Sequence, residues 1–113
     1  MKEVVWTRRE SVDPVYVHWV WCPGCEDLHC WWTAIEGEPC NRTTWEYDGN
    51  DESPTVSPSL LVSYGVDGKQ CHSFVKSGQW QFLGDCTHAL AGQTVPMVPL
   101  DWWPDDDRRI IEP

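Results

Sequence analysis

Two cysteines separated by two residues, in the segment Trp21-Cys22-Pro23-Gly24-Cys25, constrain this chain more than any other feature. The spacing lets one tight turn point two thiolates at the same metal ion, and Gly24 permits the backbone angles of such a turn. β-branched and aromatic runs stand before Cys22 and again from about His29. A strand, a Cys-Pro-Gly-Cys turn and a second strand form a zinc knuckle. A thioredoxin-like redox motif would begin a helix, and the residues after Cys25 have no helical pattern.

The rest of the chain also shows strand patterns and almost no helical periodicity. Short β-branched and aromatic runs alternate with Gly, Pro, Asn and Asp at intervals of about ten residues, which is typical of a small antiparallel β domain. One short helix is predicted at 87–91, with Gly92 as its C-cap. The fold class is therefore mainly β, a small antiparallel sheet domain with a zinc knuckle and one short helix. The predicted strands are 15–21, 29–35, 43–47, 59–64, 69–76 and 79–83.

A chain of 113 residues has the size of one domain. We expect residues 1–100 to form a single zinc-stapled β domain, whose small core draws much of its apolar area from the nine Trp residues. Residues 101–113 contain an acidic run, which predicts a solvated C-terminal tail. The alternative is that Trp102 and Trp103 fold back and cap the sheet.

The charge balance limits the partners. Eighteen acidic residues against eight Lys and Arg give a formal net charge of −10, which opposes direct binding to nucleic acid or to anionic lipid. No apolar run reaches the ~20 residues of a membrane helix, and the first ten residues lack the apolar core of a signal peptide. The expected location is the cytoplasm, where a metal site or free thiols are favoured over disulfides.

The other ligands of a closed metal site come from a predicted hairpin with its loop at 77–78. Alternate residues of a strand share a face, so Cys71 and Cys86 lie on one face of the hairpin and His72 on the other. His88 reaches the cysteine face if the strand continues, and is the alternative fourth ligand. The predicted ligands of one tetrahedral Zn²⁺ are Cys22, Cys25, Cys71 and Cys86.

Four stretches, in a fixed order, carry a resemblance to a known family. They are Cys22-Pro23-Gly24-Cys25 with His29, Ser53-Pro54-Thr55-Val56-Ser57-Pro58-Ser59-Leu60, Cys71-His72-Ser73-Phe74-Val75, and Gln81-Phe82-Leu83-Gly84-Asp85-Cys86-Thr87-His88-Ala89-Leu90-Ala91-Gly92-Gln93-Thr94-Val95. Together they resemble small proteins that are common in bacteriophages and prophages, some of which are labelled ammonia monooxygenase. The resemblance covers roughly residues 16–95, and its last stretch is the most specific.

The resemblance implies a small zinc-binding β protein, encoded by a phage and located in the bacterial cytoplasm. It implies no reaction, and the monooxygenase label has no support because a copper oxygenase of that kind is a membrane enzyme. Members often have Ser at the position of Cys86. This favours His88 or His72 as the fourth ligand, whereas the alternation along the hairpin favours Cys86.

Two functions follow from these features. The expected one is a non-enzymatic phage accessory protein with a structural zinc site, which binds a host protein and imitates nucleic acid by its acidity. The alternative is a small zinc-dependent hydrolase with an open metal position for water. His72, Asp85 and His88 would then supply ligands or acid–base groups, and Asp85 could orient an imidazole. The favoured interpretation of Asp85 is instead a structural one, as the cap of the short helix that contains His88. The sequence has no His-Glu-x-x-His motif and no nucleophile elbow.

Overall fold

The protein consists mainly of two antiparallel β-sheets. The computed structural model describes residues 2–65, 67–108 and 110. A three-stranded sheet has the order β1-β2-β3 and a five-stranded sheet the order β4-β5-β6-β7-β8, so the predicted mainly β class is confirmed. In chain order the elements are β1 (Trp6–Arg9), β2 (Val15–Cys22), β3 (Asp27–Ala34), β4 (Glu46–Tyr47), β5 (Val56–Ser63), β6 (Gln70–Lys76), β7 (Gln79–Phe82), β8 (Thr94–Pro96), the 3₁₀ turn η1 (Leu100–Trp102) and the helix α1 (Asp105–Arg108).

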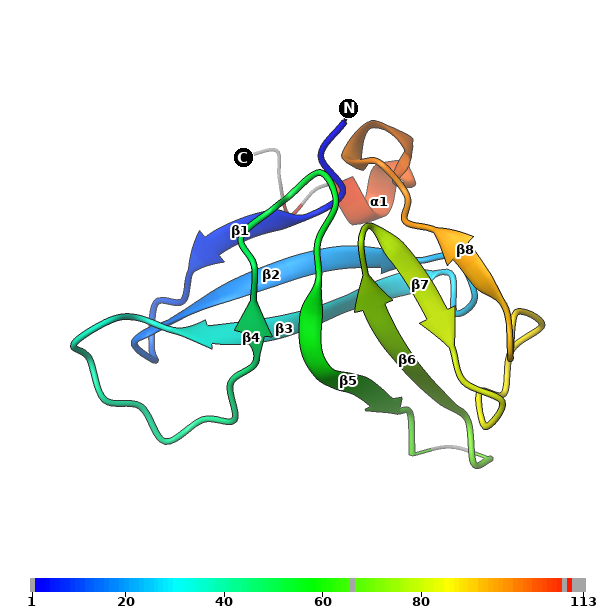
Figure 1. Cartoon of the computed structure of the whole chain (residues 1–113), viewed down its shortest axis with the longest axis horizontal. Coiled ribbons are helices and arrows are strands. Elements are labelled where there is room, and N and C mark those ends of the chain that lie inside the picture. The colour runs from blue at the N-terminus through cyan, green and yellow to red at the C-terminus, as the bar shows by residue number, and fades with distance from the viewer. Residues whose placement is uncertain (1, 66, 109, 111–113) are drawn as a thin grey trace.

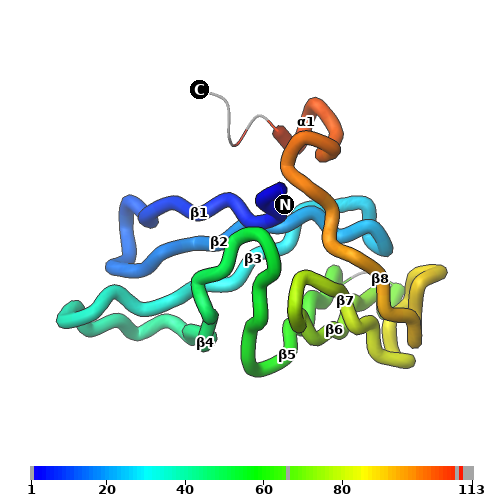
Figure 2. The backbone as a smooth tube through the Cα atoms, turned by 45° about the horizontal axis from the view of Figure 1, so that its top comes forward, coloured from blue at the N-terminus to red at the C-terminus, as the bar shows by residue number. Residues whose placement is uncertain are grey.

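The two sheets form two layers whose strands run in clearly different directions (Figure 1). Figure 2 shows β1, β2 and β3 as one layer and β5 to β8 as the other. Side chains from both layers meet between them, among them Val20 and Trp31 from the first sheet and Val75 and Trp80 from the second. Trp31 and Trp80 are fully buried, so two of the large aromatic rings form the centre of the core.

The hairpin formed by β6 and β7 has the predicted register. Lys76 pairs with Gln79 across the loop at 77–78, and both loop residues have the positive φ angles (49° and 75°) that a two-residue hairpin turn requires. Cys71 is buried between the sheets, while its neighbour His72 lies on the outer face and is partly exposed. The alternation predicted for this hairpin is therefore confirmed along β6.

The one short helix does not lie where the sequence predicts it. Residues 87–92 form turns, in which the Ala91 N–H donates to the carbonyl oxygen of His88 at 3.2 Å. A helical nucleus fixes several residues for one hydrogen bond, so a five-residue segment gains little from becoming helical. The helix is α1, which follows Pro104 and carries three Asp residues in its first turn, where they oppose the positive end of the helix dipole.

Part of the predicted acidic tail packs against the sheets. Trp103 is buried and its indole N–H donates to Val98 O at 3.2 Å, whereas Trp102 is exposed. The Trp21 indole N–H donates to an Asp107 carboxylate oxygen at 2.8 Å. Residues 109 and 111–113 of this segment lie outside the described residues. Within the described residues, none of the helices is long and apolar enough to cross a membrane.

Candidate active site and metal centre

A serine, a histidine and an aspartate form a continuous hydrogen-bonded row on the outer face of the five-stranded sheet. Ser59 Oγ lies 3.0 Å from His72 Nε2, and His72 Nδ1 lies 3.1 Å from Asp85 Oδ2. An ionised carboxylate only accepts hydrogen bonds, so Nδ1 carries the proton of the neutral ring. Nε2 then accepts the hydrogen bond from the Ser59 hydroxyl. This arrangement of nucleophile, base and orienting carboxylate is that of a Ser-His-Asp triad.

The local geometry of β5 brings Ser59 to His72. The β5–β6 ladder shifts register between Val56 and Leu60. Regular pairing resumes with Leu60 opposite Ser73, followed by Leu61 opposite His72. Ser59 stands two residues before Leu61, so its side chain is on the same face as His72 and diagonal to it. Bulges of this kind bend a strand and redirect a side chain, and they are common next to active sites.

Two further side chains hold the histidine and the aspartate. The Gln70 amide donates to the Asp85 carbonyl at 3.0 Å and to Asp85 Oδ2 at 3.2 Å. The Cys86 thiol donates to the backbone oxygen of His72 at 3.1 Å, and the backbone N–H of His72 donates to the Cys86 sulfur at 3.2 Å. The row remains open to solvent, because the side chains of His72 and Asp85 are 26% and 51% exposed.

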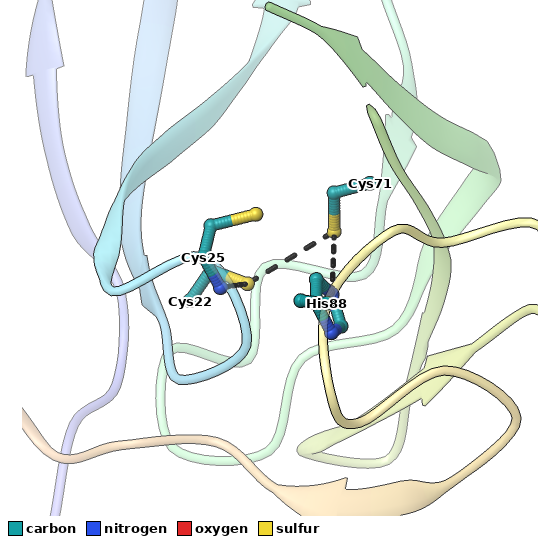
Figure 3. Close-up of side chains that lie close together, drawn as sticks. All are labelled: Cys22, Cys25, Cys71 and His88. Carbon is teal, nitrogen blue, oxygen red and sulfur yellow. Dashed lines mark hydrogen bonds between the residues drawn. The ribbon is translucent and has the colours of Figure 1, made fainter. Parts of the chain in front are cut away.

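A second cluster lies on the inner side of β6. One ligand atom from each of four residues lies within 4.8 Å of all the others, and the residues could hold a metal ion (Figure 3). The knuckle between β2 and β3 supplies two of them, β6 supplies the third and the turn segment after β7 the fourth. These residues are Cys22, Cys25, Cys71 and His88.

The distances in this cluster fit a tetrahedral metal ion. Zn–S bonds of ~2.3 Å and Zn–N bonds of ~2.0–2.1 Å place tetrahedral ligand atoms about 3.5–3.8 Å apart. The sulfurs of Cys22 and Cys71 are 4.0 Å apart, and Cys71 Sγ lies 3.4 Å from His88 Nε2. Gly24 leaves room for the ring, since a Cβ built on it would lie 2.3 Å from His88 Cε1. Three sulfurs and one imidazole nitrogen could together provide the four ligands of a tetrahedral ion.

A hydrogen bond between two buried thiols of this cluster shifts their pKa values in opposite directions. A hydrogen bond with Cys71 is the main cause that lowers the pKa of Cys22, and the same hydrogen bond raises the pKa of Cys71. Burial is the main cause that raises the pKa of Cys25. The hydrogen bond thus favours the thiolate form of Cys22, which is the form that binds a metal cation.

The structure distributes the predicted ligands over both sites. His88, the alternative fourth ligand, lies with the three cysteines of the knuckle and of β6. Cys86, placed first by the alternation argument, is bonded to the backbone of His72. His72 faces away from the cysteines, as the alternation predicted, and contacts Ser59 and Asp85. The role considered for Asp85, orientation of an imidazole, is the one that its geometry supports.

Sequence reasoning missed Ser59. No nucleophile-elbow motif surrounds it, and the sequence does not distinguish it from Ser57 and Ser63, which belong to the same strand. Its one available signal was its position within the Ser53–Leu60 stretch, which also contains the two prolines that precede the regular part of β5. The hydrogen bond to His72 depends on the register shift in β5, which no local sequence pattern predicts.

Comparison with known proteins identifies the family. A family model described as the bacterial ubiquitination-like system serine protease (BubE) matches residues 1–83, which include Ser59 and His72. No curated protein and no solved structure matches the chain. The family description is that of an enzyme, so the expected non-enzymatic accessory function is wrong, and the hydrolase alternative agrees better with this finding. Because the match covers most of the chain, this protein belongs to the BubE family of bacterial ubiquitination-like system serine proteases.

Proposed function

We propose that this protein is a serine protease in which Ser59 is the nucleophile. The observation that carries the proposal is the unbroken row from the Ser59 hydroxyl through the His72 ring to the Asp85 carboxylate. Serine is a weak nucleophile by itself and needs an adjacent base, which in turn needs an orienting partner. All three are present, and the family description independently names a serine protease.

The geometry supports a two-step acyl transfer. Ser59 Oγ attacks the carbonyl carbon of the substrate while its proton moves to His72 Nε2. The tetrahedral intermediate then collapses, the amide C–N bond breaks, and His72 gives that proton to the leaving amine. Water repeats the sequence on the acyl-Ser59 ester, so the products are a carboxylic acid and free Ser59. Asp85 stays ionised and stabilises the protonated ring of His72.

The family description supplies the proposed substrate class. Its members act in a bacterial ubiquitination-like system, so we take the cleaved bond to be an amide that involves the modifier of such a system. The open face around His72 and Asp85 suits this substrate, because a protein chain must reach Ser59 from solvent.

The metal that we propose for the four-residue cluster is Zn²⁺ in a structural site. Zinc prefers sulfur and imidazole ligands in a tetrahedral arrangement, which is the donor set of Cys22, Cys25, Cys71 and His88. Four protein ligands leave no position for a catalytic water, in contrast to the open site of a zinc hydrolase. Cys71 immediately precedes His72, and His88 follows Asp85 by three residues, so the ligands hold both partners of Ser59 in place.

Active-site labelling tests the proposed protease. A fluorophosphonate loses fluoride to an activated serine, and we expect intact-mass and peptide mapping to find one adduct per chain, on Ser59. Ser59→Ala and His72→Ala should abolish labelling, whereas Ser57→Ala, an exposed serine of the same strand, should label like the wild type. Folded wild-type protein without an adduct on Ser59 would contradict the proposal.

Metal analysis tests the zinc site separately. We expect one zinc per chain by mass spectrometry of the purified protein. A site with three cysteines and His88 leaves three of the six cysteines outside it, namely Cys30, Cys40 and Cys86. A count of two reactive thiols in the zinc-loaded protein would instead point to four cysteine ligands.

A further inference from the structure

An apolar cavity lies directly beside the proposed nucleophile. It has a volume of about 340 Å³, and most of its lining residues belong to β3 of the first sheet and β5 of the second. Among the described residues no Asp, Glu, Lys or Arg lines it, although His29 and Ser63 are part of its wall. Burial raises the pKa of its cysteine, Cys30, to about 11, so that thiol is neutral. Six of its lining side chains are Trp19, Cys30, Trp32, Trp45, Leu61 and Val62.

Ser59 does not line the cavity, but two lining residues, Trp45 and Leu60, adjoin it. The indole N–H of Trp45 donates to the backbone oxygen of Ser59 at 3.3 Å, so one wall of the cavity is bonded to the nucleophile itself. The backbone N–H of Trp45 donates to Trp32 O at 2.8 Å, which fixes this wall on β3. Leu61 pairs with His72 and is 60% exposed, so it stands where the cavity meets the catalytic face.

The sheet topology keeps this space open. β4 pairs with β5 only at Val56 and Ser57, and within the described residues no strand pairs with that side of β5 beyond them. β3 is likewise an edge strand of its own sheet. Two sheet edges therefore face each other next to Ser59, with aromatic side chains between them and no strand to fill the gap.

We propose that this cavity binds a large apolar side chain of the substrate, within the two residues on the acyl side of the cleaved bond. The inference rests on the proposed protease function. Ligand sites in proteins are concave and mostly apolar, and a volume near 340 Å³ accommodates one or two substrate side chains. A mostly apolar cavity without Lys or Arg among its described lining residues disfavours an acidic side chain, because burial would remove much of its hydration without a strong compensating charge.

The acyl side is the part of the substrate that needs a dedicated pocket. In a ubiquitination-like conjugate the acyl group comes from the modifier and is common to every conjugate, while the amine comes from varied targets. A fixed cavity next to Ser59 therefore fits the constant side of the bond, and differential binding there would select modifier conjugates over other proteins.

Peptidyl diphenyl phosphonates test this inference. Ser59 Oγ displaces one phenolate from phosphorus and its proton passes to His72, so adduct formation requires no turnover. We would vary the two side chains before the phosphorus among Leu, Phe, Gly and Asp, and measure the second-order rate of Ser59 modification by intact mass. Wild-type protein should prefer Leu or Phe over Gly and Asp by about 10-fold or more at one of these positions.

Variants that alter the cavity should remove this preference. Cys30→Phe fills the space, and Leu61→Asp places a charge at its opening on a residue that is mostly exposed, so the second variant does not depend on repacking the core. Both should lower the rate for Leu and Phe reagents about 10-fold more than they lower the rate for Gly reagents, so the apolar preference is lost. The matched controls are Cys40→Phe, at a partly buried thiol outside both the cavity and the metal cluster, and Val12→Asp in an exposed loop.

The outcomes separate the two proposals. If a small fluorophosphonate fails to modify Ser59 in the folded wild type, the protease function is overturned and the cavity proposal falls with it. If the fluorophosphonate modifies Ser59 but the phosphonates show no apolar preference, only the cavity proposal is overturned. The same holds if both cavity variants keep the wild-type preference.

Discussion

At the scale of single residues, function depends on partners more than on residue type. Asp85 is one of many acidic residues in a chain with a net charge of −10, and it differs from the others by accepting hydrogen bonds from both His72 and Gln70. Cys86 is one of six cysteines, and it differs from the others because its sulfur is hydrogen-bonded to both the backbone N–H and the carbonyl oxygen of His72. Residue identity alone therefore predicted neither role, although the sequence placed Asp85 close to histidines.

Asp85→Asn should inactivate the protease while leaving it folded. An amide can donate to Nδ1 of His72, which moves the ring proton to Nε2 and removes the acceptor for the Ser59 hydroxyl. We expect kcat to fall roughly 10³–10⁴-fold on a peptide or conjugate substrate. Asp67→Asn, an exposed residue outside the site whose positive φ suits Asn, should have wild-type kcat. Equal activity of Asp85→Asn and wild type would exclude Asp85 from the row.

Gly24→Ala should weaken metal binding through His88. The new Cβ would lie 2.3–2.5 Å from three ring atoms of His88, closer than non-bonded atoms approach, so the ring must move away from the three sulfurs. We expect the zinc affinity, measured by competition with a chromophoric chelator, to fall roughly 10–100-fold, as when a group that orients a metal ligand is disturbed. Gly84→Ala is the matched control, because its Cβ would meet nothing within 4 Å. Equal affinities in both variants would place His88 outside the site.

At the scale of secondary-structure elements, local sequence patterns predicted those structural features that depend on residues close together in the chain. The Ser-Gly turn and the alternation of β6 with β7 were sufficient to give the hairpin register and to place His72 opposite to Cys71. The register shift in β5 depends on pairing with β6, more than ten residues away, so it and the position of Ser59 escaped prediction. The strands β1 and β8, each at one edge of its sheet, escaped prediction as well, since they are only four and three residues long.

His18 links three strands and makes the first sheet sensitive to acid. Its ring is buried between the hydroxyls of Thr7 on β1 and Thr33 on β3, at 2.7 and 2.8 Å. Burial lowers the pKa of His18 to about 4, an effect that the charge of Asp51 partly offsets. Between pH 6.5 and 4 the unfolded chain therefore binds a proton at His18 that the folded chain does not bind, which favours unfolding as the pH falls.

The expected cost of this proton is roughly 2 kcal/mol of folding stability by pH 5, relative to pH 7.5. Urea unfolding of wild type and of His18→Gln at both pH values measures it, because other acid-sensitive groups, including the metal ligands, contribute equally to the two proteins. The wild type should lose about 2 kcal/mol more than the variant. If the two proteins instead lose the same stability between these pH values, the folded and the unfolded chain protonate His18 alike, and the prediction is wrong.

At the scale of the whole molecule, the metal cluster joins the two sheets at the place where the catalytic row is anchored. Cys22 and Cys25 belong to the knuckle of the first sheet, while Cys71 belongs to β6 of the second and is adjacent to His72 in sequence. The chemistry takes place on the outer face of β6 and the cross-link on its inner face. This division follows from the alternation of a β-strand, which sends neighbouring side chains to opposite faces. The metal is thus expected to control activity through the position of β6 and of the segment that carries Asp85.

Removal of the metal should therefore unfold the protein and not merely slow it. Structural zinc sites contribute ~10–16 kcal/mol at neutral pH, which equals or exceeds the ~5–15 kcal/mol total stability of a typical domain. We expect a strong chelator, or Cys22→Ser or Cys25→Ser, to abolish the cooperative thermal transition and fluorophosphonate labelling together, and added zinc to restore both to the chelated wild type. Cys40→Ser removes a thiol outside the cluster and should melt like the wild type. If the chelated protein keeps its melting temperature but loses labelling, the metal has a local role at His72. If it keeps both, the metal does not stabilise the fold.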